Sequence, residues 1–400
     1  MEDEIRQTRF ATKSVHSGTN PIGDAVNTPI FLSSTYKLTD ERYAGWAAGA
    51  QHTMLYSRLS SVNSEAVVTK LVSMEEAEDG EVFASGMAAI STTLLGLLSS
   101  GDHIIASPDV YGGTYGLLTE DLPRFGIEVT MANMRDPASY EAAIKENTKM
   151  IYVETISNPV LKVCDLDAMA DIAIKHNLIS VVDNTFASPW ACNPIKHGFD
   201  LVIHSGTKYL GGHSDLIAGF VVGKKEIIAD IFPKKVHFGG AADPHMCYLL
   251  ERGMRTLHAR MPIHTSNAQE LAKRLTGHHM IQYVNHISLP EHKDYDIARR
   301  IIPRGSGMIS FVLQGGDAAA LKFMKSLKIT LEATSLGGVE SLVESPFNSS
   351  HMFIPEDIRN ENGILPGFVR MSVGIEDIED IWSDINQALS VAENFLASRA

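Results

Sequence analysis

The stretch ISVVDN at 179–184, together with DLVIHSGTKYLGG at 200–212, decides the fold class of this chain. Each stretch contains a short apolar run typical of a strand buried on both faces, and two similar runs are HIIAS at 103–107 and MIYVET at 150–155. Between two of these runs, DLDAMADIAIKHN at 165–177 carries apolar residues at helical spacing. Strands that alternate with helices predict an α/β fold with a mainly parallel central sheet.

The rest of the 400 residues is organised around this region. Residues 1–60 are rich in Thr, Ser, Pro and Gly and have no long periodic segment, which indicates an arm that contacts a neighbouring subunit. We expect a large domain over 61–250 and a smaller α+β domain over 251–400. The smaller domain has strand candidates at GMISFVLQGG, 307–316, and GFVRMSVGIED, 367–377, and ends in an amphipathic helix.

Composition and charge exclude several classes of protein. The 48 Asp and Glu residues outnumber the 34 Lys and Arg residues, and the formal net charge of −14 disfavours binding to nucleic acids and anionic membranes. Three widely spaced cysteines form no disulfide framework, which favours a reducing compartment such as the cytoplasm. The charged N-terminus MEDEIRQTRF and the lack of a long apolar run predict a soluble protein without a targeting or membrane-spanning segment.

Polar residues that follow the predicted strands are candidates for ligand binding, because parallel sheets bind ligands at that edge. Gly86 and Met87 open a helix after EVFAS, and free N–H groups there favour a phosphate, although such helix starts are more often structural. Asp183 ends the run ISVVD, so its buried carboxylate needs a cationic or N–H partner. A pyridinium nitrogen would serve, and the alternative is a helix cap or a structural hydrogen bond.

Lys208 follows the next strand, with Ser205 and Thr207 just before it and glycines on both sides. A lysine in a constrained turn can lose its proton and attack an aldehyde to form a Schiff base, while the two hydroxyls bind phosphate. A single lysine at a strand end is usually a surface charge, so this prediction depends on the whole set. His204 and His213 match no common ligand spacing, and we therefore expect no metal site.

Five motifs occur in a characteristic order: VETISNP, VVDNTFASP, HSGTKYLGGHSD, SLGGVESL and VRMSVGIED. In this order they resemble the Cys/Met-metabolism PLP-dependent enzymes, which include cystathionine γ-synthases, cystathionine γ-lyases, methionine γ-lyases and homoserine-ester sulfhydrylases. The resemblance covers about residues 13–395. It implies a PLP-dependent transferase fold of the aspartate-aminotransferase type, an amino-acid substrate, and a homotetramer built from dimers with shared active sites.

The resemblance also implies roles for individual residues. Lys208 would carry pyridoxal 5'-phosphate (PLP) as a Schiff base, Asp183 would pair with its pyridine nitrogen, and Tyr111 would stack on the ring and assist catalysis. The residues implied in binding are Gly86, Met87, Ser205 and Thr207 for the phosphate, Tyr56 and Arg58 for the neighbouring subunit's phosphate, and Asn158, Ser335 and Arg370 for the substrate carboxylate.

Departures from the family pattern bear on the substrate. Residues 59–64, LSSVNS, replace a GNPT-like stretch after YSR and leave the shape of that loop open, and GGT at 112–114 replaces the GCT typical of methionine γ-lyases. Gly116 and Thr334 stand where enzymes that handle cystathionine often have an arginine and a glutamate. The distal end of cystathionine would therefore lack its usual partners, unless Gly116 serves only the turn after Tyr111.

We expect a C–S lyase that releases a 2-oxo acid, ammonia and a thiol from cystathionine, methionine or homocysteine, most simply by γ-elimination. The alternative within the family is γ-replacement on an O-acyl-homoserine. Alternatives of other kinds are an aminotransferase that shares the fold and a non-catalytic protein that retains it.

Overall fold

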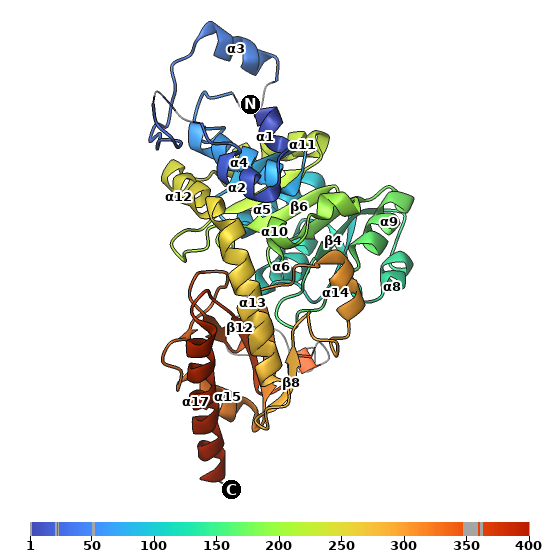
Figure 1. Cartoon of the computed structure of the whole chain (residues 1–400). Coiled ribbons are helices and arrows are strands. Elements are labelled where there is room, and N and C mark those ends of the chain that lie inside the picture. The colour runs from blue at the N-terminus through green and yellow to red at the C-terminus, as the bar shows by residue number, and fades with distance from the viewer. Residues whose placement is uncertain are drawn as a thin grey trace.

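The chain forms two β-sheets joined by a long helix, α13 (Leu257–Leu275), which runs from the region of the first sheet to that of the second (Figure 1). The computed structural model describes residues 2–20, 22, 24–49, 53–346, 359–360 and 363–399. The first sheet has seven strands in the order β1-β7-β6-β5-β4-β2-β3, and the second has five in the order β10-β11-β12-β9-β8.

The first sheet is mainly parallel, which confirms the predicted α/β class. Its strands are β1 (Asp79–Phe83), β2 (His103–Ala106), β3 (Glu128–Met131), β4 (Thr148–Glu154), β5 (Ile179–Asp183), β6 (Leu201–Ser205) and β7 (Gly219–Gly223). Neighbours from β3 to β6 run parallel, and β7 runs antiparallel to both β6 and β1. The four apolar runs of the sequence correspond to β2, β4, β5 and β6. The carboxyl ends of β4, β5 and β6 therefore meet at one edge.

Helices cover both faces of the first sheet. One face packs against α4 (Val62–Glu75), α9 (Leu166–His176) and α12 (Pro244–Arg255), through buried residues such as Leu71, Met169 and Leu250. The other face packs against α5 (Gly86–Leu97) and α11 (Lys225–Phe238), through Leu94 and Ile231 among others. Burial on both faces explains why these strands appear in the sequence as continuous apolar runs.

The helix expected at 165–177 is α9, and both of its ends follow from the sequence. The side chain of Asp165 accepts a hydrogen bond from the N–H of Ala168 and caps the first turn, and Asn177 ends the helix in the left-handed conformation. In the altered loop after Arg58, the side chain of Ser61 caps α4 and forms a capping box with Ser64. This departure from the family pattern thus starts a regular helix.

Shorter helical segments connect the main elements of the first sheet. They are α6 (Gly112–Gly116), a π-helical turn (Leu117–Asp121), α7 (Leu122–Arg124), α8 (Pro137–Ala142), α10 (Ser188–Ala191) and a 3-10 turn (Pro194–His197). Within the described ranges, no helix is long and apolar enough to cross a membrane.

The second sheet is mainly antiparallel. Its strands are β8 (Ile281–Asn285), β9 (Met308–Leu313), β10 (Leu331–Glu332), β11 (Leu342–Glu344) and β12 (Phe368–Ser372), and the helices that pack on it include α15 (Gly316–Met324) and α17 (Ile378–Ala397). The helix α14 (Tyr295–Ile301) instead packs against the core of the first sheet through Ala298 and Ile301. A core that includes Leu271, Phe323 and Leu389 joins α13, α15 and α17 to this sheet. The domain boundary expected near residue 250 falls inside α12, and the division into domains stays a prediction.

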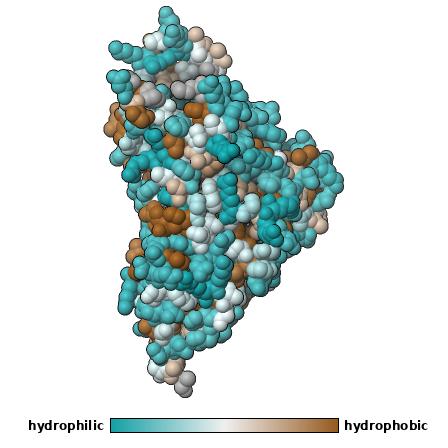
Figure 2. Space-filling model, in the orientation of Figure 1, coloured by the Kyte–Doolittle hydropathy of each residue, from teal (hydrophilic) through white to brown (hydrophobic). Residues whose placement is uncertain are grey.

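The N-terminal arm includes three short helices, α1 (Glu2–Arg6), α2 (Phe10–His16) and α3 (Asp40–Ala47). α2 lies on the body of its own chain, where the Oγ of Ser14 donates a hydrogen bond of 2.6 Å to the carbonyl of Met254. α3 stands away from the body (Figure 1). Val26 and Leu32 are exposed by 84% and 75%, respectively, so this part of the arm presents apolar surface. The face shown in Figure 2 is otherwise mostly hydrophilic, with separate hydrophobic patches.

Candidate active site

A cavity of about 950 Å³ lies at the carboxyl ends of β4, β5 and β6, and residues of β11, of β12 and of the loop between β10 and β11 close the other side. The predicted site residues that line it are Gly86, Met87, Tyr111, Asn158, Asp183, Ser205, Thr207, Lys208, Ser335 and Arg370, and Gly116 and Thr334 line it as well. The structure thus brings together segments that are far apart in the sequence, from the helix start at Gly86 to β12. A cavity of this size is large enough for a cofactor and a small substrate.

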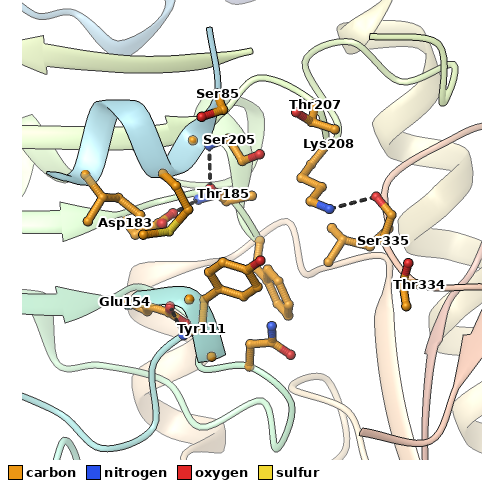
Figure 3. Close-up of a pocket in the computed structure, with 18 of the residues that line it drawn as sticks. Ser85, Tyr111, Glu154, Asp183, Thr185, Ser205, Thr207, Lys208, Thr334 and Ser335 are labelled. Atoms are coloured by element: carbon orange, nitrogen blue, oxygen red, sulfur yellow. Dashed lines mark hydrogen bonds between the residues drawn. The ribbon is translucent and has the colours of Figure 1, made fainter. Parts of the chain in front are cut away.

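One end of the cavity combines a helix N-terminus with two side-chain hydroxyl groups. The side chain of Ser85 accepts a hydrogen bond of 3.0 Å from the N–H of Ala88 and caps α5, whose first residue is Gly86. A Cβ atom on Gly86 would lie 3.1 Å from the Cβ of Ser205, so glycine allows the helix start to approach β6 closely. Ser205 and Thr207 add two hydroxyl groups beside this helix N-terminus (Figure 3). N–H groups and hydroxyls in this arrangement match a phosphate.

Lys208 projects into the middle of the cavity. Its Nζ donates a hydrogen bond of 2.7 Å to the Oγ of Ser335 (Figure 3). Burial, together with the smaller effect of the nearby positive charge of Arg370, lowers the pKa of Lys208 to about 8. A neutral amine is therefore accessible near physiological pH, as nucleophilic attack on an aldehyde requires.

Asp183 lies at the end of β5 with its side chain buried in the cavity wall. Its Oδ1 accepts a hydrogen bond of 2.9 Å from the N–H of Thr185. Burial raises the pKa of Asp183, and the hydrogen bonds of Thr185 and the charges of His204 and Lys208 act in the opposite direction. A cationic group in the cavity would stabilise the ionised form of this carboxyl.

Arg370 lies on β12 at the opposite wall. Its guanidinium donates a hydrogen bond of 2.6 Å to Oδ1 of Asn158 and one of 3.1 Å to the carbonyl of Ser335, and it forms an ion pair with Glu344. Burial lowers the pKa of Arg370. Its Nε is buried without a hydrogen-bond partner in the part of the chain that the structure describes. A carboxylate bound beside Arg370 would supply both charge and an acceptor.

Tyr111 and Gly116 lie at the two ends of α6, on the side of the cavity toward solvent. The backbone N–H of Tyr111 donates a hydrogen bond of 2.6 Å to Oε1 of Glu154, and its ring lies in the cavity (Figure 3). Gly116 has helical φ and ψ angles of −59° and −44°, and a Cβ there would meet nothing within 4 Å. The backbone at Gly116 therefore does not require glycine, and a side chain at this position has room.

Tyr56 and Arg58 do not line the cavity of their own chain. Arg58 donates a hydrogen bond of 2.7 Å to the carbonyl of Val236, and its guanidinium lies 5.6 Å from the centre of the Tyr56 ring. A role for these two residues in a phosphate site thus requires a second subunit and stays a prediction.

The two histidines near Lys208 have other partners. Nε2 of His204 lies 2.6 Å from Oε1 of Glu75, with both side chains buried, and Nδ1 of His213 lies 2.8 Å from the carbonyl of Gly211. Among the described residues, no three His, Cys, Asp or Glu side chains cluster as a metal site would require.

The sequence analysis missed several residues of the cavity, among them the polar residues Glu154, Thr185 and Glu344. Glu154 ends the apolar run MIYVE in the same way as Asp183 ends ISVVD, so the same signal points to both. Glu344 has no such local signal, because its place beside Arg370 depends on the pairing of β11 with β12.

The cavity therefore offers an anion site, an amine of lowered pKa, a buried carboxyl and a buried guanidinium. This set fits PLP, whose phosphate, aldehyde and ring nitrogen need the first three groups, and it leaves the guanidinium for a substrate carboxylate. Gly86 supports the fit, since a larger residue would fill the space between α5 and β6.

Comparisons with known proteins agree with this fit. The chain is 39% identical over 395 residues to an L-methionine γ-lyase of Porphyromonas gingivalis, with 97% of this chain and 98% of that protein covered. It is 40% identical over 386 residues to a cystathionine β-lyase of Lactococcus lactis, with 96% and 99% covered. A crystal structure of cystathionine γ-lyase from Lactobacillus plantarum, complexed with L-serine, superposes with a TM-score of 0.91 at 37% identity and covers 96% of this chain and 100% of that chain.

A family model described as Cys/Met metabolism PLP-dependent enzyme matches residues 11–390. The match spans both sheets and every residue of the cavity named above. The chain belongs to the PLP-dependent enzymes of cysteine and methionine metabolism.

Proposed function

We propose that this protein is a C–S lyase that uses PLP to cleave a sulfur amino acid by γ-elimination, with methionine, homocysteine and cystathionine as candidate substrates. One observation carries the proposal. Ser335 accepts the hydrogen bond of Lys208 at its hydroxyl and that of Arg370 at its carbonyl. Ser335 therefore contacts both the amine of Lys208, which would transfer protons, and the guanidinium of Arg370, which would bind the substrate carboxylate.

The relatives support the choice of reaction. Those compared above are named methionine γ-lyase, cystathionine β-lyase and cystathionine γ-lyase, and all three names describe cleavage of a bond to sulfur. When bound, PLP supplies an aldehyde that condenses with amines and a ring that stores the electron pair released at the substrate α-carbon.

Residues that line the cavity would bind the cofactor and the substrate. Gly86, Met87, Ser205 and Thr207 would hold the phosphate, and Asp183 would hold its negative charge next to the pyridine nitrogen. Arg370 and Asn158 would fix the substrate carboxylate and so orient the α-carbon toward Lys208.

Lys208 and Tyr111 would carry the chemistry. The Nζ of Lys208 would take the proton from the α-carbon and later act at the β-carbon. The Tyr111 hydroxyl, in a ring that lies in the cavity, would assist departure of the thiol.

The distal part of the cavity favours a compact substrate. Gly116 and Thr334 both line it, and neither carries a charge that could pair with the distal ammonium or carboxylate of cystathionine. Each polar group left unpaired costs about 1–3 kcal/mol. Methionine, homocysteine or an O-acyl-homoserine should therefore be preferred.

The assembly that fits this site is a homotetramer built from dimers. Arg58 and Tyr56 lie outside the cavity of their own chain, and the arm that carries them presents apolar surface at Val26 and Leu32. We infer that the pair completes the phosphate site of the neighbouring subunit.

Cys164, Cys192 and Cys247 are free thiols, which supports a location in the cytoplasm.

A substrate panel tests the proposal. Methionine, homocysteine, cysteine, cystathionine and O-acyl-homoserine are assayed with and without a thiol, and 2-oxo acid and thioether products are measured. A C–S lyase gives 2-oxo acid without added thiol. A thioether formed only from O-acyl-homoserine and thiol would instead establish γ-replacement, the alternative reaction.

The Lys208→Ala variant is the control for the panel. It should fold and bind PLP noncovalently, lose the visible absorbance of the Schiff base, and show no turnover. Full activity in this variant would refute the proposed role of Lys208.

A further inference from the structure

Glu154 is a buried carboxyl group in the cavity wall that the proposed reaction does not use. It is the last residue of β4 and is 4% exposed. In the parallel register of β4 and β5, Glu154 pairs with Asp183. Residues paired in this way point to the same face of a sheet, and both line the cavity. Figure 3 shows the two side chains at the ends of neighbouring strands, beside Tyr111.

The hydrogen bonds of Glu154 fix the main chain at two places in the site. Its Oε1 accepts the backbone N–H of Tyr111 at 2.6 Å. The backbone N–H groups of Tyr111 and Asn158 both act as hydrogen-bond donors that lower the pKa of Glu154, against the larger effect of burial, which raises it. Tyr111 and Asn158 belong to the segments that carry the ring in the cavity and the amide that contacts Arg370. One carboxyl group thus connects the turn at the cofactor with the turn at the substrate carboxylate.

The surroundings of Glu154 disfavour a negative charge on it. Burial raises its pKa well above the usual value, and the charge of Asp183 raises it further. The charges of Asp183 on β5 and Asp109 after β2 raise the pKa of Glu154, and the charge of Glu154 in turn raises the pKa of Tyr152 on β4. Asp109 is already paired with Lys162 at 2.6 Å, whereas Lys208 and His204 act on Asp183. Two neighbouring buried carboxyls do not both ionise readily, and the cations favour ionisation of Asp183.

We propose that Glu154 is a positioning residue that works in its protonated form, so that its carboxyl fixes the main chain at Tyr111 while the negative charge stays on Asp183. The proposal rests on the proposed function, because it takes Asp183 and Tyr111 as contacts of the cofactor. In this proposal Glu154, at the end of β4, is protonated and fixes the main chain, whereas Asp183, at the end of β5, is ionised and faces the cofactor.

The Glu154→Gln variant of the holoenzyme tests the protonated state. Glutamine keeps the acceptor for the Tyr111 N–H and has the shape of a neutral carboxyl. Its turnover, its KM and its affinity for PLP should stay within about threefold of the wild type, since the acceptor of the Tyr111 N–H is kept. A loss of turnover of about tenfold or more, or failure of this variant to fold, would overturn the proposal.

Infrared spectroscopy detects the protonation state of the Glu154 carboxyl group and does not depend on turnover. The difference spectrum of wild type minus Glu154→Gln at neutral pH should contain the band of a protonated carboxyl group. A carboxylate band in its place would refute the proposal, whatever the activity of the variant.

The Glu154→Leu variant tests positioning. It leaves the Tyr111 N–H without its acceptor, so the PLP dissociation constant and the KM should both rise about tenfold, the equivalent of about 1.4 kcal/mol for one lost hydrogen bond. The visible spectrum of the bound cofactor should shift, because the ring of Tyr111 moves. An unchanged spectrum and an unchanged dissociation constant would contradict the positioning role.

Glu81→Gln is the matched control. Glu81 is equally buried on a strand of the same sheet, but it pairs with Lys235 and does not line the cavity. This variant should lower the thermal midpoint and leave the cofactor spectrum unchanged. A wild-type protein without visible absorbance and without turnover would count against the proposed function. An altered Glu154→Gln variant in an active wild-type background would count against the role of Glu154 alone.

Discussion

The Nζ of Lys208 and the Oγ of Ser335 are joined by a hydrogen bond of 2.7 Å, which connects the end of β6 with the loop before β11. Ser335 has a φ of 83°, a left-handed conformation that is costly for a residue with a side chain. The chain thus holds a strained serine at the point where its hydroxyl orients the amine. This relationship leads to the first prediction.

Ser335→Ala should lower kcat about fivefold, because an amine without its 2.7 Å acceptor loses about 1 kcal/mol of orienting interaction. The cofactor should remain bound. Steady-state kinetics and the visible spectrum measure both effects.

Ser335→Gly is the matched control, since glycine accepts a φ of 83° without strain and also lacks the hydroxyl. It should lose as much activity as Ser335→Ala. Recovery of wild-type activity in Ser335→Gly would show that the backbone, and not the hydroxyl, is what matters.

The lowered pKa of Lys208 predicts how the cofactor-free enzyme takes up PLP. Only the neutral amine attacks an aldehyde, and the neutral fraction increases as the pH rises through about 8, instead of the ordinary lysine pKa of 10.5. The rate of Schiff base formation, followed by absorbance, should therefore rise from pH 6 and level off above about 8. Continued increase to pH 10 would mean that burial does not depress this pKa.

Arg58→Ala should weaken PLP retention, and mixtures with Lys208→Ala should recover part of the activity. In a dimer with shared sites, a mixed pair contains one site with an intact Lys208 and an Arg58 from the other chain. Mixed dimers, isolated with two different affinity tags, should give about a quarter to a half of the wild-type rate per dimer. No recovery in confirmed mixed dimers would show that Arg58 serves its own subunit.

Gly116→Arg should shift the preference toward cystathionine. A Cβ at Gly116 meets nothing within 4 Å, so the backbone and its surroundings accept a side chain there, and the charge of the arginine is expected to pair with the distal carboxylate. The ratio of kcat/KM for cystathionine to that for methionine should rise about tenfold. Gly116→Met adds similar length without charge and should leave the ratio unchanged.

In the wild type, kcat/KM for methionine, homocysteine or an O-acyl-homoserine should exceed that for cystathionine. A preference of tenfold or more for cystathionine would show that other residues bind its distal end.

The sequence predicted the strands best where burial leaves the chain little choice. ISVVD and LVIHS are covered on both faces, so their apolar runs gave β5 and β6 to within one residue. Lys208 and Asp183 follow such runs, but each position alone also fits a surface charge or a structural hydrogen bond, so their predicted roles depended on the whole set of motifs. The family match supports the fold and the cofactor that those motifs implied.

Contacts across the fold could not be predicted in this way. The ion pair of Glu344 with Arg370 depends on the register of β11 and β12, and the hydrogen bond from Tyr111 to Glu154 joins residues 43 positions apart. Gly116 illustrates a different limit, because a glycine in a sequence does not show whether its backbone needs one. Its helical angles and the space around it settle that question.

The open space at Gly116 also has an evolutionary consequence. This residue lies on a short helix outside the sheet, whereas Lys208 and Asp183 are fixed by the packing of neighbouring strands. Substitutions at Gly116 are therefore expected to leave the strands that hold the reactive groups undisturbed. If the Gly116→Arg variant gains activity on cystathionine, single substitutions at the edge of the cavity would be enough to change the sulfur substrate in evolution while the reactive groups stay in place.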